Sequence, residues 1–356
     1  GTVNTTSPQV LKVTVQAPTA PTTITTVVGA ATVDPSNAIA ELNETNNQSA
    51  VVSTVINGQV RISAVQGGGT ASPLVGNTVL VQGIVTGVFQ GTSTLAGFFL
   101  QEEDVNSDGN PATSEGIFVY TNLAPATVAV GDKVNVSGSV IEFGTAPNTL
   151  TEITSPTVTF ISAGNTLPSA AAVTLPVAVI GDLERYEGMR VNFAQPLTLT
   201  DNNNLAQFGE LTFSVNGRLL QPTSSIDPND AIASGTTSTG TTNAAAITAR
   251  NSLNSRSSII LDDGSTAQYP AIIPFMDAAT KTIRVGSTIT SFTGILSQSF
   301  GTHRLLAPTA PVINYAPRPL TPPAVGGNVK IAGANVLNYF NGDGAGNTFP
   351  TSRGAN

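Results

Sequence analysis

The sequence predicts an all-β protein made of small barrels in tandem. Its 356 residues include 34 Gly and 23 Pro, and only 10% are charged, which is typical of a loop-rich β-protein. Short runs in which apolar and polar residues alternate recur along the chain, with Gly, Pro and Asn between them. A chain of this length has room for two or three domains, each with its own core.

Residues 1–60 contain three strand-like runs, VLKVTVQA, TITTVVG and SAVVSTVI, separated by Pro and Asn turns. Three strands make a thin sheet with open edges, so we expect a partial β-sandwich that leans on a neighbour or belongs to a larger sheet. The polar turn before the third run carries Asp34, Asn37, Glu41 and Asn43. Their oxygens can hold a cation or form a solvated Asx-rich turn, and the residue types favour the turn.

Residues 61–165 carry five alternating runs, which suit a five-stranded, OB-like barrel. In the fourth run, Val134, Val136 and Val140 alternate with polar residues, which places the three on one face of a strand. Glycines interrupt the runs where a small barrel must coil tightly. These glycines are Gly83, Gly87 and Gly138.

The connection between the second and third of these runs carries the most specific motif in the chain. It joins GFFL to GIFVY and matches the pattern D-x-N-x-D-G, five residues and Glu. This spacing is typical of calcium loops, but the β-branched and aromatic flanks predict strands in place of helices. We expect a structural Ca²⁺ ion in a hairpin loop, and a plain polar turn is the alternative. The expected ligands are Asp104, Asn106, Asp108, Asn110 and Glu115.

Residues 166–318 repeat this plan. The segment VGDKVNVSGSVIEFG at 130–144 returns as VGSTITSFTGILSQSFG at 285–301, each followed by a strand, which predicts a second OB-like barrel. A long insertion at 222–258, rich in Ser, Thr, Gly and Asn, holds one Ala-rich patch that can form a short helix. In residues 319–356 a Pro-rich linker leads into the start of another domain.

Charge limits the expected partners. A net charge of −8 argues against a general nucleic-acid coat, and residues 62–165 hold eight carboxylates against one Lys. Residues 166–318 are nearly balanced, so any contact with nucleic acid is expected there; solvated surface charge is the competing interpretation. The absence of Cys excludes disulfides and cysteine zinc sites, and no apolar run is long enough to span a bilayer. The candidate phosphate contacts are Arg250, Arg256, Arg284, His303 and Arg304.

Three parts of the chain resemble known families. DPSNAIAELNETNNQS, at 34–49, resembles the last hairpin of the adhesion-related CARDB sandwich domain. GFFLQEEDVNSDGNPATSEGIFVY, SSIILDDG and IRVGSTITSFTGILSQSFGTHRLLAP resemble the region before the catalytic domain of large secreted bacterial nucleases. NVKIAGANVLNYFNGDGAGNTFPTSRGAN, at 328–356, resembles the opening strand of the endonuclease/exonuclease/phosphatase superfamily, with Gly-Ala where Ser-Phe is usual.

The last resemblance implies an α/β hydrolase stub whose Asn335 belongs to an incomplete metal and phosphate site. The family also uses a metal-bound Glu and a His–Asp pair near the end of its domain, but the only His here is His303, which precedes Asn335. Mg²⁺ is therefore expected only for a nuclease domain outside this chain. Whether the full-length protein is an enzyme stays open, and the chain itself lacks the catalytic set.

Two functions follow. In the first, the chain is the non-catalytic scaffold of a secreted nuclease, located outside the cell or at its surface. In the second, calcium-stiffened β-modules self-associate into fibres or adhesive layers at the cell surface, because an incomplete sheet exposes edges that another chain can pair with.

Overall fold

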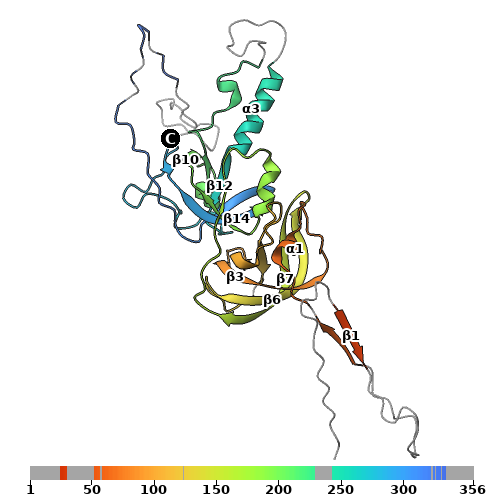
Figure 1. Ribbon diagram of the computed structural model, residues 1–356. Coiled ribbons are helices and arrows are strands. Elements are labelled where there is room, and N and C mark those ends of the chain that lie inside the picture. Colours follow the sequence, from red (N-terminus) through yellow and green to blue (C-terminus); the bar gives the residue numbers. More distant parts are fainter. Residues whose placement is uncertain are drawn as a thin grey trace, which may run out of the picture. The chain divides into compact units, whose positions relative to one another are not determined.

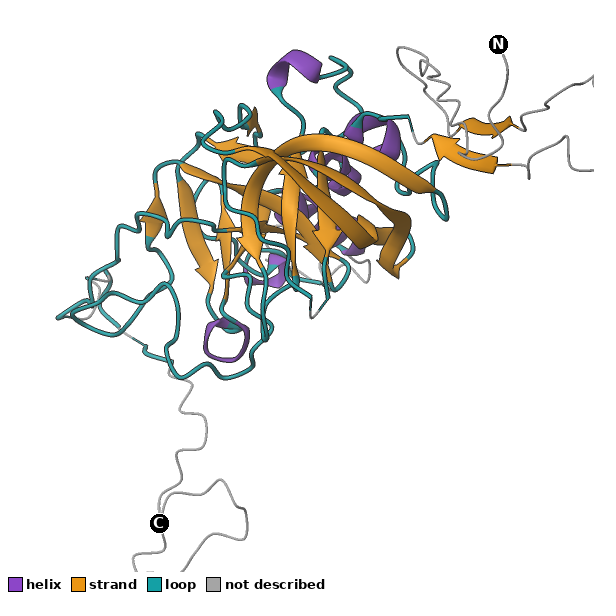
Figure 2. Ribbon diagram, turned by 90° about the horizontal axis from the view of Figure 1, so that it is seen from below, coloured by secondary structure: helices purple, strands orange, loops and turns teal. Residues whose placement is uncertain are grey.

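The computed structural model describes residues 25–29, 52–56, 58–122, 124–228, 243–321, 324, 326–329 and 331–333. Strands dominate its regular structure (Figure 2), so the all-β class expected from the sequence is confirmed. Contacts divide the chain into two units, Gly1–Ala316 and Pro317–Asn356, and every described strand and helix belongs to the first.

The N-terminal part contains a two-stranded antiparallel sheet. It pairs β1 (Thr25–Gly29) with β2 (Val52–Ile56), so the second and third strand-like runs do form strands. The first run and the polar turn at 34–43 lie outside the described residues, and the partial sandwich stays a prediction.

A closed five-stranded barrel follows (Figure 1). The strands are paired in the order β3-β4-β5-β7-β6. The β5–β7 pair is parallel and the other neighbours are antiparallel. The strands are β3 (Thr78–Phe89), β4 (Gly97–Gln101), β5 (Gly116–Tyr120), β6 (Lys133–Thr145) and β7 (Asn148–Ser162).

The barrel core shows the alternation expected from the sequence. Val134, Val136 and Val140 are fully buried in it. The β6–β7 register shifts at Gly138, where a Cβ would lie 2.6 Å from the Thr154 carbonyl oxygen, so only glycine fits the tight coil. A helix that the sequence analysis did not predict, α1 (Ile62–Gln66), adds Ile62 and Val65 to this core.

The second half forms an eight-stranded sheet in the order β13-β10-β11-β12-β15-β14-β9-β8. Its strands are β8 (Ala171–Ala172), β9 (Arg190–Phe193), β10 (Leu197–Asp201), β11 (Glu210–Ser214), β12 (Ser258–Asp262), β13 (Thr288–Ile289), β14 (Phe292–Ser299) and β15 (Thr302–Leu306). Two short helical segments join them: η2 (Ile180–Tyr186) and α2 (Leu205–Phe208).

This sheet is not one closed ring of hydrogen bonds, as the expected second barrel would be. Its strand pairing nevertheless repeats that of the first barrel. In the first barrel, the start of β3 pairs with β6 and its end pairs with β4. In the second sheet two strands share this role, because β9 pairs with β14 and β10 pairs with β11. β12 and β15 are parallel, as β5 and β7 are. Residues 194–196 separate β9 from β10, and Pro196 lacks the N–H that would continue the ladder.

The strand pairing also shows where the sequence repeat and the insertion lie. The two similar segments include β6 and β14, which occupy the same position in the pairing. The insertion lies between β11 and β12, and its Ala-rich patch forms the helix α3 (Ala244–Arg256) after the turn η3 (Pro222–Ser224). Residues 229–242 lie outside the described residues.

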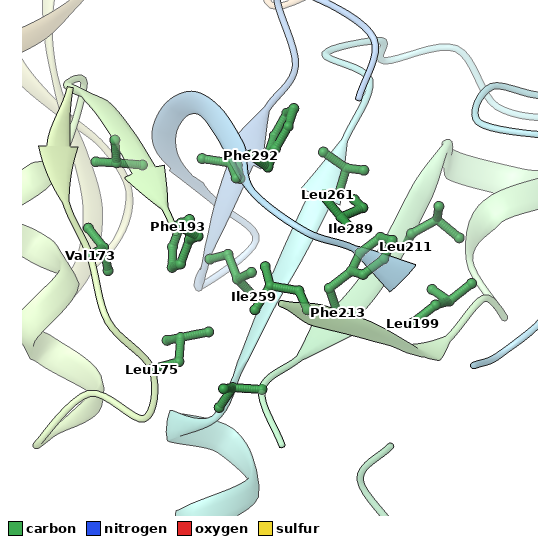
Figure 3. Close-up of a cluster of buried hydrophobic side chains, with 14 of the residues drawn as sticks. Val173, Leu175, Phe193, Leu199, Leu211, Phe213, Ile259, Leu261, Ile289 and Phe292 are labelled. Atoms are coloured by element: carbon green, nitrogen blue, oxygen red, sulfur yellow. The ribbon is translucent and has the colours of Figure 1, made fainter. Parts of the chain in front are cut away.

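Three apolar clusters hold the first unit together. One fills the first barrel, and a second, with Phe193, Phe213 and Ile259, lies within the second sheet (Figure 3). The third joins the two halves. It packs Phe99 and Phe118 of the barrel with Ile295 and Leu306 of the sheet.

Candidate metal centre

The hairpin that was expected to bind calcium is formed as predicted. β4 and β5 pair in antiparallel register, with Phe98 opposite Val119. Residues 102–115 connect them and include one helical turn, η1 (Asp104–Asn106). The backbone N–H of Glu102 donates to the Glu115 carbonyl oxygen at 3.0 Å, so these two residues face each other across the base of the loop.

Three of the five expected ligands make hydrogen bonds to residues outside the expected ligand set. The Asp104 carboxylate accepts hydrogen bonds from the backbone N–H and the hydroxyl of Ser169, at 2.9 and 2.6 Å. The Asn106 side-chain amide donates to Glu103, and the backbone carbonyl oxygen of Asn110 accepts from the backbone N–H and the hydroxyl of Thr113, at 3.3 and 3.1 Å. Among the described residues, the three acidic members of the motif do not together reach metal-binding spacing.

The other two expected ligands do come together. Glu115 Oε1 accepts hydrogen bonds from the Asp108 backbone N–H and the Ser107 hydroxyl, both at 2.8 Å. Asp108 itself accepts from the Asn110 backbone N–H and the Thr113 hydroxyl. Partial burial raises the pKa of Asp108, but these hydrogen bonds outweigh it and lower the pKa below its usual value.

A third carboxylate, which the motif did not include, lies beside them. Glu102 is only 4% exposed, and its Oε1 accepts a hydrogen bond from the Ile62 backbone N–H at 3.1 Å. Burial, together with the hydrogen bond and the charge of the neighbouring Glu115 carboxyl, raises its pKa to about 8. The sequence did hold a signal for Glu102: in an antiparallel hairpin that pairs residue 101 with 116, residue 102 faces 115.

Two oxygens of this group lack a partner. Among the described residues, Oε2 of Glu102 and Oε2 of Glu115 are buried without a hydrogen-bond donor. None of the ion pairs in the described part of the chain includes Glu102, Asp108 or Glu115. Nor does any cluster of three His, Cys, Asp or Glu side chains there reach metal-binding spacing, so a cation would also need hydroxyl, carbonyl or water oxygens.

The loop also ties the barrel to the second half of the unit. Ser169 lies between the two halves, and the Ser114 hydroxyl donates to the Glu187 carbonyl oxygen in the second half. Gly116 and Gly188 bring the two backbones into direct contact. A cavity of about 240 Å³ separates the loop from Arg185, Tyr186 and Met189.

The five residues expected to contact phosphate do not form one group with the loop, and each has its own partners or position. Arg304 is buried, and its Nη1 pairs with Glu210 at 2.6 Å and Asp262 at 2.5 Å. His303 lies 3.5 Å from Glu184. The remaining three are Arg256, which donates to the Val177 carbonyl oxygen, Arg250, which is exposed on α3, and Arg284, which precedes β13.

Arg304→Met is expected to destabilise the protein by about 3 kcal/mol, because it leaves the buried carboxylate of Asp262 and the half-buried one of Glu210 without their cation. Chemical denaturation measures the change, and Arg250→Met on exposed α3 is the control, with an effect within about 0.5 kcal/mol. Binding of single-stranded DNA is expected to be the same for both variants; a selective loss with Arg304→Met would contradict its structural role.

Asn335 lies outside the described residues, so the structure gives no geometry for the expected hydrolase stub. None of the helices in the described ranges has the length and hydropathy that a membrane crossing needs.

No family model matches the chain, and no curated protein matches it.

Proposed function

We propose that this chain is the non-catalytic scaffold of a secreted, metal-dependent nuclease, with two OB-like barrels that precede the catalytic domain. The OB-like assignment rests on the strand order of the first barrel and its parallel β5–β7 pair, which suit a five-stranded Greek-key barrel. The same pairing in the second half supports a tandem of the two. The nuclease assignment rests on the sequence resemblances.

The contacts between the two halves are the observation that supports the scaffold function. Apolar side chains from both halves share one buried cluster, and the Ser114–Glu187 hydrogen bond and the Gly116–Gly188 contact reinforce it. An interface that combines apolar burial with close backbone contact resists hinge motion, unlike the more polar interfaces of mobile domains. Such a rigid pair of modules is suited to hold a following domain at a fixed distance.

The chemistry of the described residues is also that of a scaffold. His303 is the only His in the chain, and its side chain, 9% exposed, lies against Glu184. A proton donor for phosphodiester cleavage must reach the substrate, and this one is held inside the protein. Of the family's magnesium and phosphate residues only Asn335 has a counterpart here, so no catalytic step is derived for this chain.

Plasmid cleavage tests the proposal. The chain alone with Mg²⁺ is expected to leave supercoiled DNA intact, whereas the protein extended through the following domain is expected to cleave it. In the extended protein, Asn335→Ala should reduce cleavage at least 100-fold with an unchanged melting temperature, since it removes a group at the metal and phosphate site. Cleavage by the chain alone, or an extended protein without activity, would overturn the proposal.

The second candidate is self-assembly at the cell surface. The observation that favours it is the β1–β2 sheet, in which each strand pairs with one neighbour among the described residues; a strand that pairs on one side only can be completed by another chain. Light scattering distinguishes the two functions. A scaffold stays monomeric at micromolar concentration, whereas strand complementation gives a mass that grows with concentration.

A further inference from the structure

We propose that the cavity between the outer face of the first barrel and the second sheet binds a small organic cation, a primary amine on an apolar body, with the Glu152 carboxylate as its counter-ion. The cavity has a volume of about 290 Å³, which is at the lower end for ligand pockets in proteins, so the occupant is small. The proposal depends neither on the nuclease assignment nor on calcium.

The alternation of side chains along the strands of both halves forms the cavity. In β7, Ile153 belongs to the core of the first barrel, so its neighbour Glu152 lies on the outer face. In β15, Leu305 belongs to the core of the second sheet, so Arg304 lies on the face toward the barrel. The two faces meet at the third apolar cluster, and the cavity lies beside it. The apolar part of the cavity wall includes Phe118, Tyr120, Phe143, Leu150 and Leu306.

The Glu152 carboxyl is the first argument, because no described residue gives it a partner. Glu152 is 4% exposed and lines the cavity, and no ion pair in the described part of the chain includes it. Burial and the charge of Glu142 both raise its pKa, and no hydrogen bond from a described residue lowers it. Protonation would remove the charge but leave a buried hydroxyl donor without an acceptor, so the described residues satisfy neither state.

The charges around the cavity are the second argument. Arg304 also lines the cavity, but its Nη1 is bound by both Glu210 and Asp262, so its charge is already balanced. Glu152 and the neighbouring Glu142 add negative charge that no ion pair among the described residues balances. Charge complementarity therefore favours a cationic occupant over a neutral or an anionic one.

The chemistry of the wall is the third argument, and it selects an organic cation. The hard cations Ca²⁺ and Mg²⁺ need about six oxygen ligands or more, whereas this cavity offers mainly apolar and aromatic side chains. The faces of aromatic rings attract cations, and Phe118, Tyr120 and Phe143 supply such rings.

The depth of the cavity suits a molecule with one charged end. Phe143 is 60% exposed and Glu152 is 4% exposed, so the cavity connects a solvent-accessible rim with a buried carboxyl. An arylalkyl ammonium ion would donate its N–H groups to Glu152 and lay its apolar body along the aromatic and aliphatic side chains.

Calorimetric titration of the whole chain with 2-phenylethylamine at pH 8 tests the site. We expect one molecule per chain with a Kd below about 1 mM, and at least about tenfold weaker binding of 2-phenylethanol, which has the same body without the charge. Phenylacetate, with the opposite charge, is expected not to bind. Equal binding of the amine and the alcohol, or no binding of the amine up to about 10 mM, rules out a cation site in this cavity.

Variants locate the binding. Glu152→Gln keeps the shape of the side chain and removes its charge, so the affinity for 2-phenylethylamine should fall at least about tenfold and the preference over 2-phenylethanol should disappear. Asp201→Asn is the matched control, since it makes the same charge change at an exposed carboxyl at the end of β10, and the affinity should stay within about twofold.

Phe143→Ala provides a second variant at the exposed rim, where the substitution leaves the fold intact. It removes one aromatic face and should weaken binding of 2-phenylethylamine about threefold or more. An unchanged affinity in a folded Glu152→Gln variant contradicts the proposal, and if that variant does not fold, an unchanged affinity in Phe143→Ala does so.

Discussion

Gly116→Ala is expected to lower the free energy of unfolding by about 3 kcal/mol, the upper range for overpacking. A Cβ at this position would overlap the carbonyl group of Gly188 and the backbone N of Met189. Both of these atoms are backbone, so no side chain can turn away to make room. The only relief is to separate β5 from the second half, which would also open the shared apolar cluster.

Gly181→Ala is the matched control for this substitution. Gly181 also lies in the second half, it has no positive φ, and nothing lies within 4 Å of the Cβ that would be added. We expect a change within about 0.5 kcal/mol by denaturant unfolding. Equal stability of the two variants would show that the backbones of Gly116 and Gly188 are not in contact.

Without metal, the protein is expected to lose stability as the pH rises from about 5 to 8. Burial, together with the charge of Glu142, raises the pKa of Glu152 to about 7. Burial likewise raises the pKa of Glu102 to about 8 and that of Glu187 well above its usual value. Between its unfolded value of 4.5 and its folded value, each group binds more protons in the folded state, so stability falls as pH increases.

The effect of Glu152 alone is about 3 kcal/mol as an upper value, since each pKa unit corresponds to about 1.4 kcal/mol. Its carboxyl lies on the β7 face that lines a cavity of about 290 Å³ together with Phe118, Leu150 and Ile141. Glu152→Gln removes the titrating group and should flatten this part of the pH profile, measured by urea unfolding in EDTA at pH 5, 6, 7 and 8. A stability that is constant or rises over this range in the unmodified protein would contradict the expectation.

Local residue patterns were sufficient to predict the strands. The alternation of Val134, Val136 and Val140 predicted a strand with one buried face, because a β-strand turns successive side chains to opposite sides. The flanks of the loop at 102–115 predicted a hairpin in place of two helices for a similar reason, since their β-branched and aromatic residues fit a pleated sheet. The Ala-rich patch predicted α3 through helix propensity.

The ligand set could not be predicted in the same way. The motif assigned Asp104 by its spacing alone, and spacing does not reveal that Ser169, distant in the sequence, supplies two hydrogen bonds to this carboxylate. Arg304 was similarly interpreted as a phosphate contact, and its partners Glu210 and Asp262 come from two other strands. Spacing along the chain contains no information on such partners.

The sequence by itself determined the all-β class, the hairpin and the positions of most strands, because these depend on periodicities and residue types within a few neighbours. The tertiary structure decided how the modules join and which carboxylates meet. Gly116 meets Gly188, and Glu102 meets Glu115 over the N-terminus of α1, only after the barrel has closed. Burial then raises the pKa of Glu102 and of Glu187, since desolvation depends on what the whole fold packs around a group.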